Sequence, residues 1–244
     1  MKITHSQYDD ALFSQNRPKE PLLNVPFIII FLIAFCFFIY FVSHFVSDQL
    51  HARIFVLFAF IPVFFKADPV GCFHTVVSYS FMHGSLRHIA LNMIWLLVFG
   101  SPLVRHLGNL RFLIFWVLTA VASVLTYFIF HQNSEIPLIG ASGAIFGMMG
   151  AAVRYFFSTC SNSSTRDGKF ERPLLSIREA LHSRTVLIYL GVWFMINFIT
   201  GIFPYFSEED NVSIAWEAHV GGLISGFLLI SFFNIPWRKS KITV

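Results

Sequence analysis

The chain has 244 residues, of which 56% are hydrophobic and only 12% are charged, and its mean hydropathy is +0.68. A soluble domain of this length could not bury so much apolar surface, so the composition predicts an integral membrane protein and excludes ordinary soluble classes. The formal net charge of +4 does not indicate nucleic acid or another acidic partner, because membrane proteins accumulate Lys and Arg on their cytosolic side.

The three cysteines, Cys36, Cys72 and Cys160, are scattered and odd in number. They form no CxxC pair, so they predict neither a disulfide framework nor a metal knuckle. Nothing else in the sequence indicates a cofactor.

The chain begins with a polar arm, residues 1–21, which is too long and too charged for the start of a signal peptide. We expect a membrane domain over residues 22–236 and a cytosolic tail over residues 237–244. Six apolar runs approach the ~20 residues that a spanning helix needs. They are Leu22–Val46, Phe81–Leu103, Phe112–Phe130, Gly140–Phe157, Thr185–Phe203 and Ile214–Ile235. The predicted fold is therefore all-α, a bundle of six transmembrane helices.

Two further segments are predicted not to cross the bilayer. Ile54–Phe65 is apolar but has only twelve residues and contains Pro62. At about 1.5 Å per residue it is too short to span, so we expect an interfacial loop that lies partly in the membrane. The polar segment 158–183, rich in Ser and Arg, is expected to be a cytosolic loop and not a second domain.

The distribution of basic residues predicts the orientation of the six spans. With the N-terminus inside, the outer segments keep only Arg53, Lys66 and Arg87 of the 17 Lys and Arg residues. The cytosolic segments hold Lys2, Arg17, Lys19, Arg105, Arg111, Arg154, Arg166, Lys169, Arg172, Arg178, Arg184, Arg238, Lys239 and Lys241. Such an excess is typical of the cytosolic side, so both termini are expected there.

Three polar clusters lie at a similar depth near the outer ends of three predicted spans. His83, His88 and Asn92 occur in "HGSLRHIALN", Ser142 in "GASGAIFGMMG", and His219 in "EAHVGGLISG". Ionisable residues inside a membrane are costly and usually mark function. Their common depth is harder to explain by chance than any one of them.

Each of these residues also has a structural interpretation. A serine among glycines is most often a packing contact, and a lone buried histidine is more often hydrogen-bonded within the structure than a base. Gly143 and Gly147, like Gly222 and Gly226, are small residues four apart, which would let the fourth and sixth spans approach closely. That approach would bring the serine within reach of the last histidine, so the packing interpretation supports the chemical one.

The chemical interpretation makes Ser142 a nucleophile and His219 its general base, which later protonates the leaving amine. No Asp or Glu is well placed to orient the histidine, since Glu217 is two residues away and lies on another face of the helix. A Ser-His dyad is therefore implied. His83 and His88 are five residues apart, a poor spacing for one metal on one helix, so no metal site is expected.

Oxyanion stabilisation is expected from the second and fourth spans. Asn92 and His88 would donate hydrogen bonds to the oxyanion, together with backbone N–H groups around Ala141–Ser142. These amides lie at the start of the fourth span, where the helix dipole also favours negative charge.

The blocks "HGSLRHIALN", "GASG" and "AHVGGLISG" resemble the signature blocks of the rhomboid family of intramembrane serine proteases, in the family's order. The resemblance covers roughly residues 75–235. It implies that Ser142 and His219 match the catalytic dyad and that His88 and Asn92 match the oxyanion pair.

The resemblance also assigns packing positions around the site. Phe146 matches an aromatic position beneath the histidine, and Gly222 and Gly226 match glycines that bring the last helix against the serine helix. Gly140 is also expected to be a packing position around the site. Ile54–Phe65 looks like the family's first loop.

The resemblance implies the simplest rhomboid form, with six spans, which is common in bacteria, and an inner-membrane location is expected. Its partners would be membrane lipid and single-span transmembrane substrates, cut near the outer end of the substrate helix; the oligomeric state is not indicated. One departure is Phe73-His74, which stands where many members carry a Trp-Arg pair. That pair is not catalytic, so the departure puts loop anchoring in question.

Two alternatives remain. An inactive rhomboid-like adaptor would bind transmembrane clients without cutting them, but inactive members typically lose the Ser or the His, and this chain keeps both. A small transporter using His88 and His219 as a proton relay would need polar residues through the full membrane depth. The inner halves of the fourth and sixth spans, "FGMMGAAV" and "FLLISFF", are instead apolar and small.

Overall fold

The computed structural model describes residues 25–157, 165–166, 169–170, 174–202 and 215–233. Its elements are α2 (Phe27–Phe45), α3 (Asp48–Phe58), α4 (Pro62–Ala67), α5 (Thr75–Ser78), η1 (Tyr79–Phe81), α6 (Leu86–Trp95), η2 (Leu96–Gly100), α7 (Ser101–Leu107), α8 (Asn109–His131), α9 (Ser142–Phe156), β1 (Thr165–Arg166), β2 (Lys169–Phe170), α10 (Ile177–His182), α11 (Arg184–Ile202) and α12 (Trp216–Phe233). The all-α prediction is confirmed, since the strands in the described part of the chain are a two-residue antiparallel pair. The predicted arm, the predicted tail and Cys160 lie outside the described residues.

Four helical runs among the described residues are long and apolar enough to cross a bilayer: α2, the continuous run Leu86–Leu107, α8 and α12. They correspond to the predicted first, second, third and sixth spans. The predicted fourth span corresponds to α9, which has 15 residues, and the predicted fifth to α11, in which the described stretch Arg184–Ile199 is apolar but shorter than the four spans above. The number of six crossings therefore stays a prediction.

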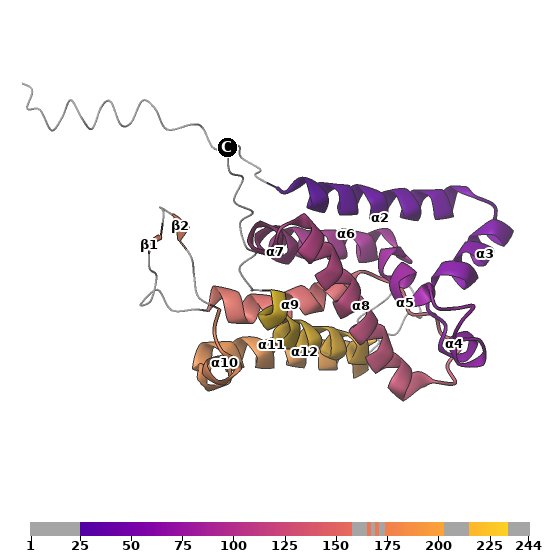
Figure 1. Ribbon diagram of the computed structural model, residues 1–244. Helices are drawn as coiled ribbons and strands as arrows, with labels where there is room; N and C mark the ends of the chain where they lie inside the picture. Colours follow the sequence, from indigo (N-terminus) through magenta and orange to yellow (C-terminus); the bar gives the residue numbers. More distant parts are fainter. Residues whose placement is uncertain (1–24, 158–164, 167–168, 171–173, 203–214, 234–244) are drawn as a thin grey trace, which may run out of the picture.

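Helix α9 is the centre of the bundle. Every residue from Gly143 to Arg154 is buried, whereas α2 and α11 carry many exposed large apolar side chains that suit contact with lipid. Figure 1 shows the long helices running side by side, with α3, α4 and α5 gathered at one end and α10 at the other. Helices α6, α9 and α12 all begin toward the α3–α5 end of the bundle.

Glycines bring the backbones of α9 and α12 into direct contact. A β-carbon on Gly222 would overlap the carbonyl oxygen of Gly143, and one on Gly226 would overlap that of Gly147. In lipid, where helices associate by close van der Waals packing, missing side chains permit this approach. The close approach of the fourth and sixth predicted spans is thus present, through the two α12 glycines.

We expected Gly143 and Gly147 of α9 to face α12 with their missing side chains, and this expectation is wrong. The missing side chains of Gly143 and Gly147 face Ser123 and Thr119 of α8, not α12. The α9 residue whose missing side chain faces α12 is Gly150, where a β-carbon would overlap the carbonyl oxygen of Leu223. Helix α9 is therefore packed closely on two sides, because its small residues occupy two faces.

The segment expected as a first loop, Ile54–Phe65, is largely helical. It holds the end of α3, a break at Ala59–Ile61 and the start of α4, where Pro62 takes the first helical position that suits proline. Within the break, Phe60 and Leu138 exchange backbone hydrogen bonds of 3.1 and 2.8 Å. This bridge ties the segment to the chain just before the serine helix.

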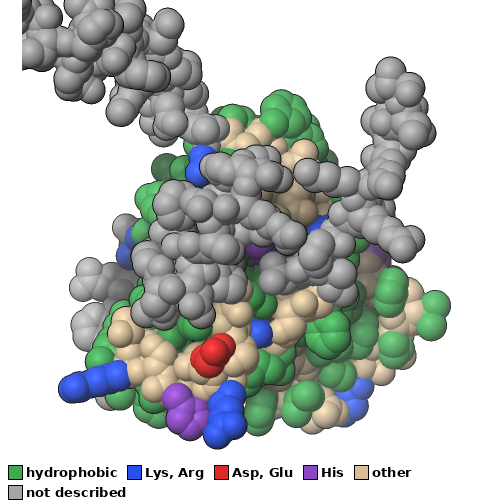
Figure 2. Space-filling model, turned by 60° about the vertical axis from the view of Figure 1, so that its left-hand side comes forward, with side chains coloured by type: hydrophobic (Ala, Val, Ile, Leu, Met, Phe, Trp, Pro, Cys, Tyr) green, Lys and Arg blue, Asp and Glu red, His purple; other side chains and the backbone are tan. Residues whose placement is uncertain are grey.

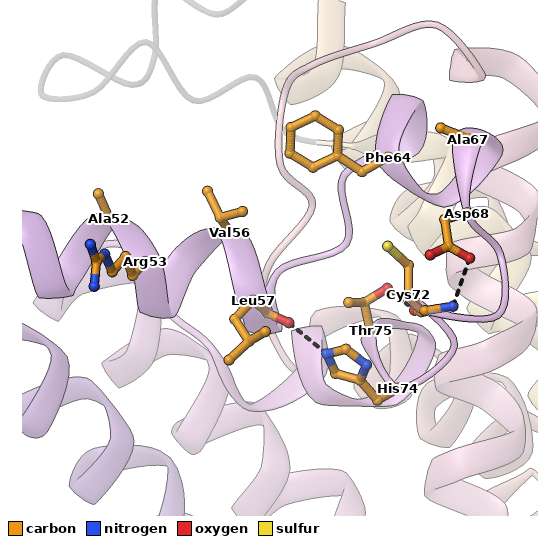
Figure 3. Close-up of a pocket in the computed structure, with 11 residues that line it drawn as sticks. Ala52, Arg53, Val56, Leu57, Phe64, Ala67, Asp68, Cys72, His74 and Thr75 are labelled. Atoms are coloured by element: carbon orange, nitrogen blue, oxygen red, sulfur yellow. Dashed lines mark hydrogen bonds between the residues drawn. The ribbon is translucent and has the colours of Figure 1, made fainter.

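A second anchor joins α3 to α5. A ring N–H of His74 donates to the carbonyl oxygen of Leu57 at 2.6 Å, and the Ser78 hydroxyl donates to that of Phe58 at 2.7 Å. Figure 3 shows the His74 ring pointing at the last turn of α3. His74 therefore provides an anchoring hydrogen bond at the position where the sequence departs from the expected Trp-Arg pair.

Candidate active site

Ser142 is the first residue of α9, and the chain enters this helix through a glycine turn. Gly140 has φ +118°, a conformation that side-chain-bearing residues rarely adopt, and its N–H donates to the Tyr79 carbonyl at 3.0 Å. Ala141 is the N-cap and is fully buried, while Ser142 itself is half-buried. The hydroxyl is therefore presented at the edge of a packed core.

His219 lies in the first turn of α12, and its Nε2 is 2.8 Å from the Ser142 Oγ. Two contacts hold the start of α12 in place. The Ser123 hydroxyl donates to the Ala218 carbonyl at 2.7 Å, and Gly222 seats the next turn on α9. The two residues predicted as a dyad, 77 positions apart in the chain, are thus joined by a hydrogen bond.

The imidazole of His219 is stacked on the ring of Phe146. Their centroids are 4.3 Å apart and their planes differ by 11°. Phe146 is one turn after Ser142 on α9 and meets Trp193 of α11 edge to face, with centroids 6.1 Å apart. The phenyl ring therefore covers one face of the imidazole while leaving both ring nitrogens accessible at its edge.

Sequence reasoning missed one residue of this arrangement, Asn197 on α11. Its Oδ1 is 2.6 Å from the Nδ1 of His219, and its side chain is buried. Asn197 stands in the apolar run "VWFMINFIT", and a polar residue in such a run is a signal for an interior contact. Its distance of 22 residues from His219 gave no indication of the pairing.

His88 and Asn92 share a face of α6, which Ser85 caps by accepting the His88 N–H at 3.2 Å. The Asn92 Nδ2 donates to the His88 carbonyl at 2.9 Å, which uses one of its two amide protons. A β-carbon on Gly140 would lie 2.8 Å from the His88 Nε2 and 3.7 Å from the Ser142 Oγ. The His88 Nε2 and the Ser142 Oγ therefore border the same small space, which stays open because Gly140 has no side chain.

The start of α9 adds backbone donors beside this space. The N–H groups of a helix's first turn have no carbonyl partner within the helix, and the dipole makes that end favourable for negative charge. Here that turn begins at the serine itself. The arrangement can hold a negatively charged oxygen next to a nucleophile and a base.

Other ionisable groups lie apart from the Ser142–His219 pair. The Glu217 carboxylate is bonded to His131 at 3.1 Å, so it does not orient His219, as the helix geometry predicted. His83 is buried and its ring meets that of His88 at 5.1 Å. Among the described residues, no three His, Cys, Asp or Glu side chains are grouped so that they could hold a metal.

A cavity of about 730 Å³ lies elsewhere, between α3, α4 and α5 (Figure 3). Its lining is mainly apolar and includes Val56, Leu57 and Phe64, with Asp68 and His74 among its polar members. None of the residues joined to Ser142 or His219 lines it. The chemistry is therefore assigned to the Ser142 site and not to this cavity.

Comparison with known proteins decides the family. The family model of the rhomboid domain matches residues 71–234. This range includes Ser142, His219 and all the residues described around them. The chain belongs to the rhomboid family. The resemblance inferred from the three signature blocks is confirmed.

Several curated rhomboids are similar to this chain. The rhomboid protease GlpG of Serratia proteamaculans is 28% identical over 162 residues, covering 66% of this chain and 48% of the relative. GlpG of Haemophilus influenzae is 26% identical over 166 residues, covering 68% and 72%. RHOMBOID-like protein 5 of Arabidopsis thaliana is 27% identical over 154 residues, covering 63% and 42%. The chain thus spans about half the length of the Serratia and Arabidopsis rhomboids.

Rhomboid membership and the apolar helices together establish an integral, multi-pass membrane protein. The family match begins before α5 and runs to the end of α12, so α2, α3 and α4 lie outside it. The site is built entirely from helices within the match.

Proposed function

We propose that this chain is an intramembrane serine endopeptidase that cleaves transmembrane segments by a Ser142–His219 dyad. The observation that carries the proposal is the 2.8 Å hydrogen bond from the Ser142 hydroxyl to the His219 Nε2. The proposal is also supported by relatives that are named rhomboid proteases.

In the proposed first step, the Ser142 oxygen attacks the scissile carbonyl carbon while its proton moves to the His219 Nε2. The carbonyl oxygen becomes an oxyanion in a tetrahedral intermediate. When the intermediate collapses, the C–N bond breaks and the same proton passes from His219 to the leaving amine. A water molecule then attacks the acyl-enzyme with His219 as base, which releases the acid and restores the serine.

The oxyanion would occupy the small space beside Gly140. His88 borders this space, and the second amide proton of Asn92 and the N–H groups at the start of α9 are proposed to point into it. Donors aimed at this position would act mainly in the transition state. Ala141 contributes as the N-cap residue that sets the direction of these amides.

The site is proposed to face the outside of a bacterial inner membrane, with both termini in the cytosol. Helices α9 and α12, which carry Ser142 and His219 in their first turns, both begin toward the α3–α5 end of the bundle, away from α10 (Figure 1). Figure 2 brings the opposite end forward and shows Lys and Arg side chains (blue) at several places around it. A basic end is typical of the cytosolic side.

The substrates are proposed to be single-span membrane proteins, cut near the outer end of their helix. Peptide bonds there can leave the helix more easily than bonds at its centre, and a serine at the edge of the buried core can be reached from that side. A protease of this kind needs no resident metal or cofactor, because the base, the nucleophile and the oxyanion donors are side chains and amides.

The test is covalent labelling of detergent-solubilised protein with a serine-directed fluorophosphonate, alongside cleavage of a single-span reporter. The native chain is expected to react at one serine and to cut the reporter, and Ser142→Ala to do neither. An adaptor would bind the reporter without cutting it, and a His-relay transporter would move protons in vesicles without labelling. Either outcome would refute the protease proposal.

A further inference from the structure

Asn197 contacts His219 on the side opposite to Ser142. Its Oδ1 is 2.6 Å from the His219 Nδ1, while its Nδ2 donates to the Trp193 carbonyl at 2.8 Å. The side chain is only 6% exposed, so water competes little for either contact. The oxygen and the nitrogen of the Asn197 amide thus each have a hydrogen-bond partner on a helix.

These contacts determine which way the amide faces. The Trp193 carbonyl can only accept a hydrogen bond, so the NH₂ group of Asn197 must face it. The amide oxygen is therefore the atom that faces His219. Because this oxygen can only accept, the histidine Nδ1 must carry the proton.

The tautomer then follows. In a neutral imidazole with its proton on Nδ1, the Nε2 has a free lone pair. This lone pair points at the Ser142 hydroxyl, 2.8 Å away, which is the arrangement a general base requires. The opposite tautomer would place an N–H against the hydroxyl and could not remove its proton.

The same contact fits the protonated histidine. After taking the serine proton, the imidazolium donates from both nitrogens, and the amide oxygen continues to accept from Nδ1. With Phe146 stacked on the face of the ring, contacts at Nδ1, at Nε2 and on the ring face together leave the ring one orientation. An amide does this without a second buried charge beside the imidazole.

We propose that Asn197 is a positioning residue that selects the tautomer and orientation of His219, so that the working unit is Ser142–His219–Asn197. This inference rests on the proposed protease function. The sequence offered no Asp or Glu to orient the histidine, and here a neutral amide from α11 takes the place that a carboxylate has in other serine proteases.

The test uses two substitutions that keep the branching of the asparagine side chain at Cγ, made in the whole chain and studied in detergent. Asn197→Leu removes the acceptor, and kcat for the single-span reporter is expected to fall about 100-fold, less than the roughly 10⁴-fold loss when a serine-protease orienting carboxylate is replaced. KM is expected to stay within about twofold, since the lost interaction does not touch substrate. Asn197→Asp keeps an acceptor at the same place and is expected to recover at least tenfold over the Leu variant.

The matched control is Met195→Leu, a half-exposed position on the same helix, which should behave as the native chain. Thermal unfolding of each preparation identifies any variant that fails to fold. Histidine tautomers are read separately by ¹⁵N NMR of ¹⁵N-histidine-labelled protein, with the His219 signal assigned by its loss in His219→Gln. The native signal is expected to show Nδ1–H, and the Asn197→Leu signal to shift toward Nε2–H.

A native-like kcat and tautomer in a well-folded Asn197→Leu preparation would overturn the inference while leaving the protease function intact. If the native chain neither cuts nor labels, the proposed function fails. The NMR comparison then still decides whether Asn197 sets the tautomer, because it does not depend on proteolysis.

Discussion

Helix α12 is contacted in two different ways by its neighbours α9 and α11. On the α9 side the two backbones touch, and a side chain at Gly222 or Gly226 would overlap the facing carbonyl oxygen. On the α11 side contact is made through side chains, including the Asn197–His219 hydrogen bond and the edge-to-face pair Phe198–Trp216, with ring centroids 5.8 Å apart.

The two interfaces control different properties of the site. The α9 interface sets the distance between the serine and the histidine, because both residues are carried on backbones in contact. The α11 interface adds the contact at the Nδ1 edge of the imidazole, which helps to set how the ring is turned. A change in distance should therefore affect the reaction at least as severely as a change in orientation.

The largest effect is expected from removing the groups whose distance is being set. Ser142→Ala and His219→Ala should each abolish reporter cleavage while leaving the fold intact. Members of a catalytic unit are not additive, so the double variant should be no worse than either single one. Cleavage rates of the three variants against the native chain check this, and substantial residual proteolysis in either single variant would remove the dyad assignment.

The distance itself is tested by Gly222→Val. The branched side chain would hold α9 and α12 apart, and a misplacement of about 1 Å can cost about 10²-fold in rate. Insertion into the membrane should be unaffected, since Val is well tolerated in a membrane helix. Cleavage and fluorophosphonate labelling of a well-folded preparation are the measurements.

The matched control for this substitution lies on the other interface helix. Among the residues that the structure describes, no neighbouring atom lies within 4 Å of the place that a β-carbon on Gly191 of α11 would take. Gly191→Val should therefore keep activity within about twofold of the native level. If Gly222→Val is equally active, the glycine contact does not control the distance between Ser142 and His219.

A smaller loss is expected at the oxyanion space. Asn92→Ala should lower kcat with little change in KM, by at most about 10²-fold, because an oxyanion donor acts mainly in the transition state and His88 and the backbone amides share the task. Asn92→Asp, which keeps the size but has no N–H to donate, is the matched comparison. An unchanged kcat with a raised KM would instead make Asn92 a substrate-positioning residue.

Much of this site could be predicted from the sequence, because its residues stand in contiguous blocks with helical spacing. Ser142, His219, His88 and Asn92 were all selected on depth and residue type, and the structure brings the first two into hydrogen-bond contact. The four long apolar helices also lie where the hydropathy indicated.

The sequence could not indicate how each helix is rotated about its axis. A pair of small residues four apart identifies a packing face but not the partner. Gly143 and Gly147 contact α12 through their carbonyl groups, but their missing side chains face α8 and not α12 as expected. Asn197 was missed for the same reason, since the sequence does not show which residue a single amide in an apolar run contacts. The helices within Ile54–Phe65 were missed because a short apolar run has no cap or period that separates helix from loop.

The smallest effect is expected at the edge of the molecule, where α3 is tied to α5 through His74 (Figure 3). His74→Ala removes a hydrogen bond to the Leu57 carbonyl in an exposed place, so it should lower unfolding stability by about 1 kcal/mol at most and activity by less than about tenfold. His74→Gln, whose amide can also donate, should restore part of the stability. Thermal unfolding in detergent and reporter cleavage measure both. A loss of kcat as large as that of Gly222→Val would mean that the first-loop segment sets the site's geometry through its bridge to Leu138, and that side-chain contacts can matter as much as the backbone contact of α9 and α12.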